Sequence, residues 1–274
     1  MLIPGESGNA GAAERGPPAE FACGCTENHD ADEAAQRLQA WNQEYRRLTP
    51  GRFEGLTTEL WFESMQDFRE RSNRRIYQTG RAWPRSVTFC IPLAMEGPAR
   101  FCGQSIDLES MLVPGLCGEL DFLTSPTLDI IGISIPQDKL ASFGASQPAF
   151  DSGSDRTRNR LIRMNPGAAS RLRVLTLSLF ESIEPEPARL ANASVREQIR
   201  DEIVDGLAAP GVDCVAQPLN AERHASESAL VRRATDYMVA NRSRSSACAK
   251  SSACRAAACS TRSSTCSERP RSTI

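Results

Sequence analysis

Cysteine and histidine are the residues of this sequence that could bind a metal ion or take part in nucleophilic catalysis. The ten cysteines include one close pair, Cys23 and Cys25, with no second pair of ligands near it. Structural zinc needs four ligands, usually supplied as two close pairs, so we interpret this pair as incidental. Four more cysteines lie near the carboxyl end: Cys248, Cys254, Cys259 and Cys266. Their irregular spacing does not favour a metal site, and we expect no metal and no cofactor.

The two histidines, His29 and His224, both lie outside the segments in which strands are expected. An open catalytic metal site needs about three protein ligands. A Ser-His-Asp or Cys-His arrangement needs a base within hydrogen-bonding distance of its nucleophile. Acids two residues apart, such as Glu119 and Asp121, are typical of the solvent-facing side of a strand. Glycine-rich phosphate-binding motifs are absent. We therefore predict no catalytic residues and no enzymatic activity.

Aromatic side chains from different expected strands could instead line an apolar pocket for a small molecule. An arginine or a glutamine nearby could orient a polar group of that molecule. The candidate ligand-binding residues are Trp61, Arg81, Trp83, Phe89, Phe101 and Gln104. Aromatic side chains also fill ordinary cores, so both interpretations of these residues stay open.

Short segments rich in aromatic and β-branched residues follow one another from Phe53 to about Phe143. Gly, Pro and polar residues separate them roughly every ten residues, which is the spacing of an all-β domain. Seven or more such strands predict an antiparallel sandwich or barrel. Prolines within several of the segments, Pro92 among them, favour sheet edges and strand ends.

Helices are expected before and after the strands in the sequence. The first is capped by Asp30, repeats apolar residues as far as Tyr45 and stops at 49–51. After a linker-like stretch at 144–160, an apolar stripe from Leu172 to Ile183 predicts a second helix. A third opens on a capping box at 194–197 and carries Val195, Ile199, Ile203 and Leu207. The last two form a helical hairpin, whose apolar faces must be covered by the strands or by a second copy of the chain.

Charge and hydropathy restrict the compartment and the partners. The net charge is −2, but the residues from Asn241 onwards include seven basic side chains and one acid, a local charge of +6. The amino terminus lacks the basic and apolar regions of a secretory signal. No apolar run approaches the length of a membrane-spanning helix. We expect a cytoplasmic protein that does not bind membranes.

A longer motif follows the first expected helix into the strands. The pattern W-x-x-x-Y-x-x-L-x-P-G-x-F-x-G spans residues 41–55. The segments FCIPLA, GELDFLTS and GISIPQDKLASF follow at 89–94, 118–125 and 132–143. As a set, they resemble the amino-terminal sensor domain of AraC-type bacterial transcription regulators, in the branch with ethanolamine-operon-like regulators. The resemblance covers roughly residues 31–240.

This resemblance implies a fold and a set of partners. In that family the sensor is a cupin-like barrel without a catalytic metal, followed by dimerising helices and a DNA-binding domain of two helix-turn-helix units. The segment at 228–242 resembles the first helix of that domain, and Arg232 and Arg233 are its candidate DNA-binding residues. The implied partners are a small-molecule effector, operator DNA and a second copy in a homodimer.

The sequence beyond this segment does not continue the DNA-binding domain. Residues 243–274 contain no Leu, Val, Phe, Tyr, Trp or Met and cannot bury a core. When each codon's first two bases are grouped with the preceding wobble base, this tail permits the family pattern Gly-Val-Ser-x-Arg-x-Leu-x-x-x-Phe, and then Gly-x-x-Pro-x-x-Tyr. Our hypothesis is that the tail is an out-of-frame translation of the domain's own coding sequence, which removes base readout.

Together these patterns predict an α+β chain: a cupin-like antiparallel β-barrel or sandwich, an α-helical hairpin and a remnant of a helix-turn-helix domain. The expected divisions are a mobile extension (1–29), the sensor domain (30–146), a linker with dimerising helices (147–227), the first DNA-binding helix (228–242) and an aberrant disordered tail (243–274). The expected function is transcription regulation by a small molecule. The alternative is a stand-alone, non-catalytic cupin-like binding module without specific DNA binding.

Overall fold

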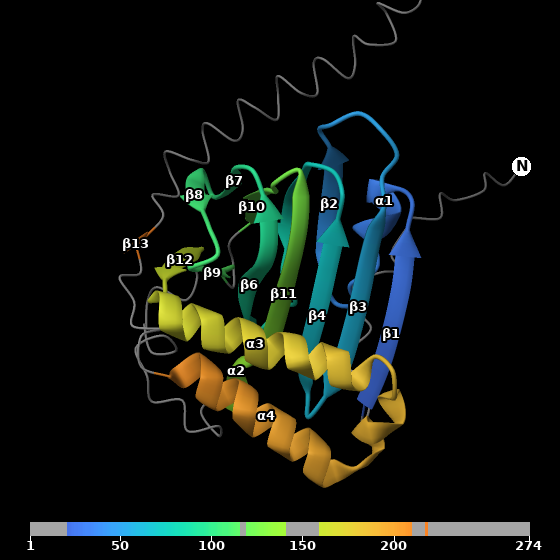
Figure 1. The fold of residues 1–274 in the computed structure, drawn as a ribbon, viewed down its shortest axis with the longest axis vertical. Coiled ribbons are helices and arrows are strands. Elements are labelled where there is room, and N and C mark those ends of the chain that lie inside the picture. Colours follow the sequence, from blue (N-terminus) through green and yellow to red (C-terminus); the bar gives the residue numbers. More distant parts are fainter. Residues whose placement is uncertain (1–20, 116–118, 141–158, 210–216, 219–274) are drawn as a thin grey trace, which may run out of the picture. The chain divides into compact units, whose positions relative to one another are not determined.

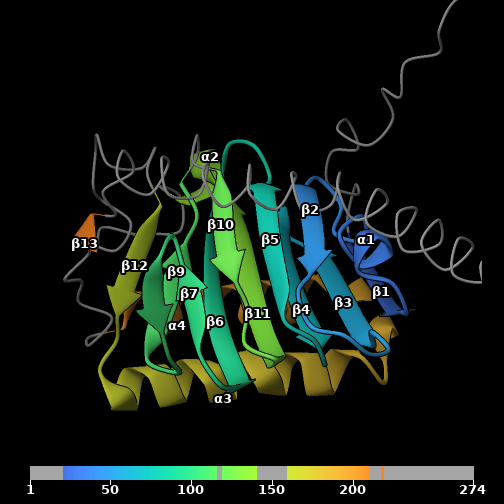
Figure 2. The same cartoon turned by 90° about the horizontal axis from the view of Figure 1, so that it is seen from above.

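The computed structural model describes residues 21–115, 119–140, 159–209 and 217–218. They form three layers: a smaller sheet, a larger sheet and a pair of helices (Figure 1 and Figure 2). The larger sheet is the middle layer, since one face packs on the smaller sheet and the other on the helices. The expected α+β fold with antiparallel sheets is confirmed. The described strands form two separate sheets and not a closed barrel.

The larger sheet contains strands from the whole described chain, and all its pairings are antiparallel. In spatial order its strands are β1 (Phe21–Asn28), β3 (Gly55–Phe62), β4 (Met65–Ser72), β11 (Thr127–Pro136), β6 (Ser86–Glu96), β9 (Ser110–Val113), β12 (Arg160–Arg163) and β13 (Gln217–Pro218). Glu63 and Ser64 join β3 to β4 with φ values of 49° and 64°. Positive φ at both central residues is the feature of the two-residue turn that matches strand twist.

The smaller sheet is also antiparallel throughout. In spatial order its strands are β2 (Asn42–Arg47), β5 (Ile76–Arg81), β10 (Leu120–Leu123), β7 (Ala99–Phe101) and β8 (Gln104–Ile106). Phe101 and Phe122 from this sheet pack on Phe68 and Leu112 of the larger one, in a core that lies between the sheets. A second core, which includes Phe89, lies between the larger sheet and the helices.

Two long helices cover the outer face of the larger sheet. α3 (Pro166–Ile183) is capped by Asn165, whose Oδ1 accepts a hydrogen bond from the Ala168 amide at 2.7 Å. α4 (Ala193–Ala208) follows a short 3-10 helix, η2 (Pro187–Ala191). The apolar stripe of α3 and the apolar residues in the carboxyl-terminal half of α4 pack against the larger sheet and each other. The sequence analysis allowed the apolar faces of these helices to be covered either by the strands or by a second copy of the chain. In the structure, the larger sheet of the same chain covers them.

The capping box expected at 194–197 is not what begins α4. Asn192 is the N-cap, and its Oδ1 accepts a hydrogen bond from the Ser194 amide at 3.0 Å. Both Asn and Ser are good N-cap residues, so the sequence alone does not separate them.

The prediction of one long amino-terminal helix from Asp30 to the stop at 49–51 is wrong. Asp30 does cap a helix, α1, but this ends at Ala34, and Tyr45 lies in β2. Tyr45 is buried with Trp41, and a four-residue spacing fits one face of a strand as well as one face of a helix. Pairing of β2 with β5 therefore decides the conformation.

Two other expectations are corrected by strand pairing. Residues 21–28 are not an extension, because β1 pairs along its whole length with β3. Pro92 is not at an edge, because β6 lies between β11 and β9. The register shifts beside it, where Ile130 pairs with Pro92 while Asp129 pairs with Ala94. Such an irregularity accommodates a residue that lacks a backbone donor.

A partly buried ion pair connects α4 to the turn between β3 and β4. Arg196 Nε lies 3.1 Å from Glu63 Oε1, and Arg200 Nη1 lies 3.5 Å from Glu63 Oε2. The Arg196 guanidinium also lies 5.8 Å from the ring centre of Phe21 on β1. One arginine thus links the helix layer to the edge of the larger sheet.

The contact between Phe68 and Gly132 predicts the effect of one methyl group. A Cβ on residue 132 would lie 2.0 Å from Phe68 Cζ. We expect Gly132→Ala to lower the free energy of unfolding by about 3 kcal/mol, because the ring has to leave a packed core. The control is Gly24→Ala in β1, where nothing lies within 4 Å of the new Cβ. Urea denaturation that shows equal stability for the two variants would contradict this packing.

The buried carboxyl of Asp67 predicts a pH-dependent stability. Asp67 is 0% exposed, and neither of its oxygens has a hydrogen-bond partner among the described residues. Burial raises its pKa to about 8. The folded state therefore holds a proton that the unfolded chain releases at about pH 4, so stability falls as the pH rises from about 4 to 8.

We expect Asp67→Asn to raise the free energy of unfolding at pH 7 by about 2–4 kcal/mol and to flatten its decline between pH 5 and pH 8. Denaturation midpoints at several pH values measure this. The matched control is Asp32→Asn, which removes an exposed carboxylate of α1. A variant as pH-dependent as the wild type would rule out Asp67 as the source.

Candidate functional site

The candidate site is a small cavity between the two sheets. Its volume is about 20 Å³, which is enough for a single water molecule. Its lining combines aromatic, aliphatic and polar side chains: Trp41, Gln43, Phe68, Glu70, Gln78, Cys90, Phe101, Leu112, Pro114, Leu120, Phe122 and Ile130. Mostly apolar walls with a few convergent polar groups are typical of small-molecule sites.

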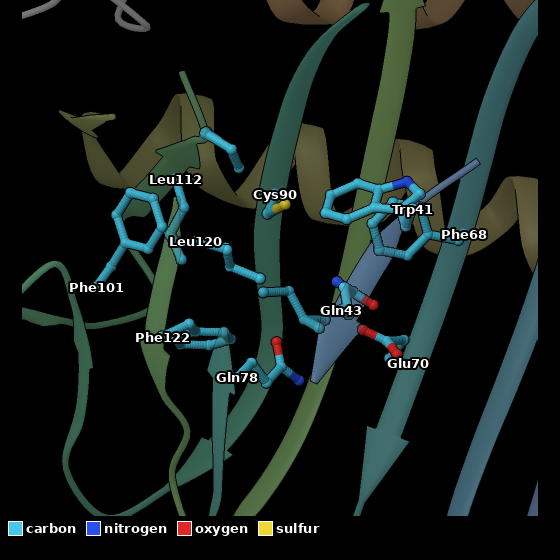
Figure 3. Close-up of a pocket in the computed structure, with 12 residues that line it drawn as sticks. Trp41, Gln43, Phe68, Glu70, Gln78, Cys90, Phe101, Leu112, Leu120 and Phe122 are labelled. Carbon is cyan, nitrogen blue, oxygen red and sulfur yellow. The ribbon is translucent and has the colours of Figure 1, made fainter. Parts of the chain in front are cut away.

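The polar groups of the cavity gather at one end. Gln43, Gln78 and Glu70 lie close together there, beside the rings of Trp41 and Phe68 (Figure 3). They come from β2, β5 and β4, so both sheets contribute to the cluster. Because successive strand residues alternate between faces, Phe68 and Glu70 share the inner face of β4 and Asp67 points to the other side.

A tyrosine hydroxyl joins two of these polar groups. Tyr45 is 3% exposed, and its hydroxyl lies 2.8 Å from Glu70 Oε1 and 2.9 Å from Gln43 Oε1. The hydroxyl has one proton, so it donates to only one of these oxygens at a time. When Glu70 is protonated, its carboxyl can donate to the tyrosine oxygen, and Tyr45 can then donate to Gln43.

Burial raises the pKa of Glu70 to about 7, and the hydrogen bond with Tyr45 opposes part of this rise. Burial and the neighbouring Glu70 also raise the pKa of Tyr45 well above its usual value. Near neutral pH the tyrosine is therefore neutral. Whether its hydroxyl donates to Glu70 or to Gln43 depends on whether Glu70 is protonated. The charge of the cavity wall changes in the physiological pH range.

A hydrogen-bond chain orients the aromatic wall. Trp41 Nε1 donates to Gln66 Oε1 at 2.9 Å, and Gln66 Nε2 donates to the Gln39 carbonyl at 2.9 Å. Gln66 is 0% exposed. The Trp41 ring then meets Phe68 edge-on, with 5.2 Å between centroids and planes at 80°, a favourable arrangement for aromatic pairs.

Of the six ligand-binding candidates, the structure places only Phe101 in the cavity. Trp61 is buried and packs edge-on against Trp83, with centroids 5.1 Å apart. Phe89 lies on the opposite face of the larger sheet, in the core beneath the helices. Arg81 is exposed at the end of β5, and Gln104 is half-buried in β8. Neither of these two lines the cavity.

The three polar residues of the cavity escaped the sequence interpretation because they lie within strands. Gln43 and Tyr45 were assigned to a helix, which hid their common face. Glu70 and Gln78 stand two residues from Phe68 and Ile76, respectively, which are buried. A polar residue two positions from a buried apolar residue lies on the same face of a strand. This spacing could have identified Glu70 and Gln78 from the sequence. The DNA-binding candidates Arg232 and Arg233, like residues 228–274 as a whole, lie outside the described residues.

A larger hollow lies on the other face of the larger sheet. This groove has a volume of about 650 Å³ and is lined by side chains that include Glu27, His29, Leu56, Arg71 and Asp129. Most of its charged residues are exposed and of mixed sign. The cavity between the sheets is the better candidate for a specific ligand, because its polar groups converge in an apolar, enclosed setting.

Two negative findings apply to the described part of the chain. It contains no group of three or more His, Cys, Asp or Glu side chains placed to hold a metal ion. In the same ranges, no helix has the length and apolar character needed to cross a membrane.

The hydrogen bond between Trp41 and Gln66 predicts the cost of changing the tryptophan. We expect Trp41→Phe to lower the free energy of unfolding by about 2–3 kcal/mol, because it leaves Gln66 Oε1 buried and unpaired and removes ring contacts. Trp83→Phe changes the half-buried partner of Trp61 and should cost less than about 1 kcal/mol. Urea titrations of both variants test this. The reverse order would show that Trp41 does not hold the cavity wall.

Comparison with solved structures finds a similar protein, but comparison with family models gives no family assignment. No protein-family model matches the chain. One similar structure is described as the crystal structure of the AraC-like transcriptional activator CuxR. It is 12% identical to this chain, the match covers 80% of this chain and 79% of that one, and the TM-score is 0.43. At this identity and TM-score, the similarity does not assign the chain to a family.

Proposed function

We propose that this chain is an AraC-type transcription regulator whose cavity between the two sheets senses a small molecule. One observation carries the proposal: the motif at 41–55, on which the resemblance to AraC-type sensors rests, is also the segment that builds the cavity. Trp41 lines the cavity, and Tyr45 lies between Gln43 and Glu70. The motif thus has a physical role at a candidate binding site.

The rest of the motif supports the same segment. Gly51 has φ of 108°, a conformation that favours glycine. Phe53 is 2% exposed and packs with Tyr45 in a small core at the end of the sandwich. A Cβ on Gly55 would lie 2.9 Å from the Phe53 ring. The prolyl-glycyl turn and the two glycines therefore hold the strand that carries Gln43 and Tyr45.

The chemistry of the walls limits the effector. It would be small and largely apolar, with a group that hydrogen-bonds to the carboxyl and amide groups of Glu70, Gln43 and Gln78. The cavity of about 20 Å³ holds no more than a water molecule. Effector binding would require the rings of the two sheets to move apart, and this movement would be the signal.

The homodimer and operator binding belong to the same proposal. Because the apolar stripes of α3 and α4 are used within the chain, the dimer would form through their outer sides. Val174, which is 63% exposed, is the most accessible large apolar residue there. The proposed regulator is cytoplasmic and not an enzyme. We further propose that the tail at 243–274 is translated out of frame. Operator binding would then be a property of the protein that is translated in the corrected reading frame.

Effector binding can be tested with the variant Gln78→Met. A compound that raises the melting temperature of the wild type should stabilise this variant much less, because Gln78 is 5% exposed at the polar end of the cavity. The control Gln104→Met changes a half-buried glutamine outside the cavity and should respond like the wild type. A ligand that stabilises the two variants equally would exclude the cavity as its site.

The reading frame gives a second test. Shifting the frame near codon 243 should create a protein that binds DNA from its own upstream region with sequence selectivity. The chain as written should bind weakly, and a rise in salt should abolish that binding, as expected for phosphate contacts alone. Mobility-shift assays at two salt concentrations compare them. Tight, salt-tolerant binding by the chain as written would refute the frameshift, and failure of both forms would favour a stand-alone binding module.

A further inference from the structure

The structure places Cys23 and Cys25 in a setting that their sequence does not reveal. Both lie on β1, the edge strand of the larger sheet, opposite Leu60 and Thr58 of β3. Residues two apart in a strand point to the same face, and Cys23 packs against the core beneath the helices. Cys23 is half-buried, whereas Cys25 is exposed. Two free thiols therefore lie side by side where the sheet meets the helix layer.

A carboxylate approaches these thiols from the helix layer. Glu184 directly follows α3, and its charge contributes, after burial, to raising the pKa of Cys23. Glu184 Oε1 is buried and accepts no hydrogen bond from the described residues. The nearby Arg69 is already held by Asp129, with nitrogen–oxygen distances of 2.9 and 2.6 Å. A carboxylate oxygen without a hydrogen-bond partner among the described residues therefore acts on the half-buried thiol.

The strand geometry suits a shared metal ion better than a disulfide. Residues i and i+2 of a strand are about 6.7 Å apart with nearly parallel Cβ vectors, whereas a disulfide needs Cβ atoms about 3.8 Å apart. Two thiolates bound to one ion at about 2.3 Å can be separated by up to about 4.6 Å. Rotation about χ1 of the two cysteines can reach this separation without a change in the backbone.

We propose that Cys23 and Cys25 form a two-thiolate binding site for a divalent, thiophilic metal ion of the zinc and cadmium class. Two thiols release two protons to solvent as the ion binds, so the charge of the site does not change. A monovalent ion would leave a net charge of −1 beside Glu184, which disfavours it. Water can fill the remaining positions of the ion.

This site is separate from the cavity and offers a second input to the helix layer. β1 also carries Phe21, which lies beneath the Arg196 guanidinium of α4. A bound metal ion would restrain β1 beside Glu184 at the end of α3. Both helices therefore have a contact through which occupancy of this site can act.

The test uses the reduced full-length chain and Cd²⁺ in competition with a chelator. Absorption by thiolate-to-cadmium charge transfer gives the number of ions bound. We expect the double variant Cys23→Ser/Cys25→Ser to bind one ion fewer than the wild type. The matched control Cys254→Ser/Cys259→Ser also removes two cysteines, and it should keep the ion that Cys23 and Cys25 bind.

Alkylation of the wild type gives a readout that does not depend on folding of a variant. Saturating Cd²⁺ should slow the reaction of Cys23 and Cys25 with N-ethylmaleimide together, as measured by mass spectrometry of their shared peptide. Protection of both cysteines, with the loss of one ion in the double variant, supports the site. Unchanged stoichiometry in a folded double variant, or protection of only one of the two cysteines, overturns it.

Discussion

The ring of Phe68 lies directly over the backbone of Gly132, and the arrangement of the two sheets depends on this contact. Only a residue without a side chain lets β4 and β11 present a flat surface there, because a Cβ would lie 2.0 Å from the ring. Trp41 then meets Phe68 edge-on and closes the gap to the smaller sheet. The cavity that we propose as the sensor site is the space left beside these rings.

The middle layer places a titratable carboxyl on each side of β4. Asp67 faces the helices and Glu70 faces the smaller sheet, and burial raises the pKa of both. Asp67 has no hydrogen-bond partner among the described residues, whereas Glu70 is tied to Tyr45 and so to Gln43. The buried carboxyl of Asp67 lowers the stability of the fold, and no hydrogen bond from the described residues offsets this cost. The carboxyl of Glu70 belongs to a network whose donors can rearrange, which is what a ligand site needs.

Part of this arrangement could be predicted from the sequence. The spacing of aromatic and branched residues indicated an antiparallel sandwich, and the stripe from Leu172 to Ile183 indicated α3. The prediction of the first helix was wrong because the spacing of Trp41 and Tyr45 fits both a helix and a strand. Pairing of β2 with β5 stabilises the strand. Trp61, Trp83 and Phe89 were proposed for the same pocket as Phe101 but lie outside this cavity, because aromatic type says nothing about the face on which a side chain lies. Phe89 and Phe101 look alike in the sequence but belong to different cores.

The sequence by itself determined the class of fold, the apolar stripes of the helices and the motif that suggested a sensor, because all three depend on local periodicity and residue type. Only the tertiary structure decided which face each strand presents to which layer, and so which residues meet. Register and layer packing are long-range properties: Gln43, Glu70 and Gln78 come from three strands, and Glu184 is far in sequence from the cysteines it approaches. A local sequence pattern does not predict such contacts, because each depends on how distant segments pair and pack.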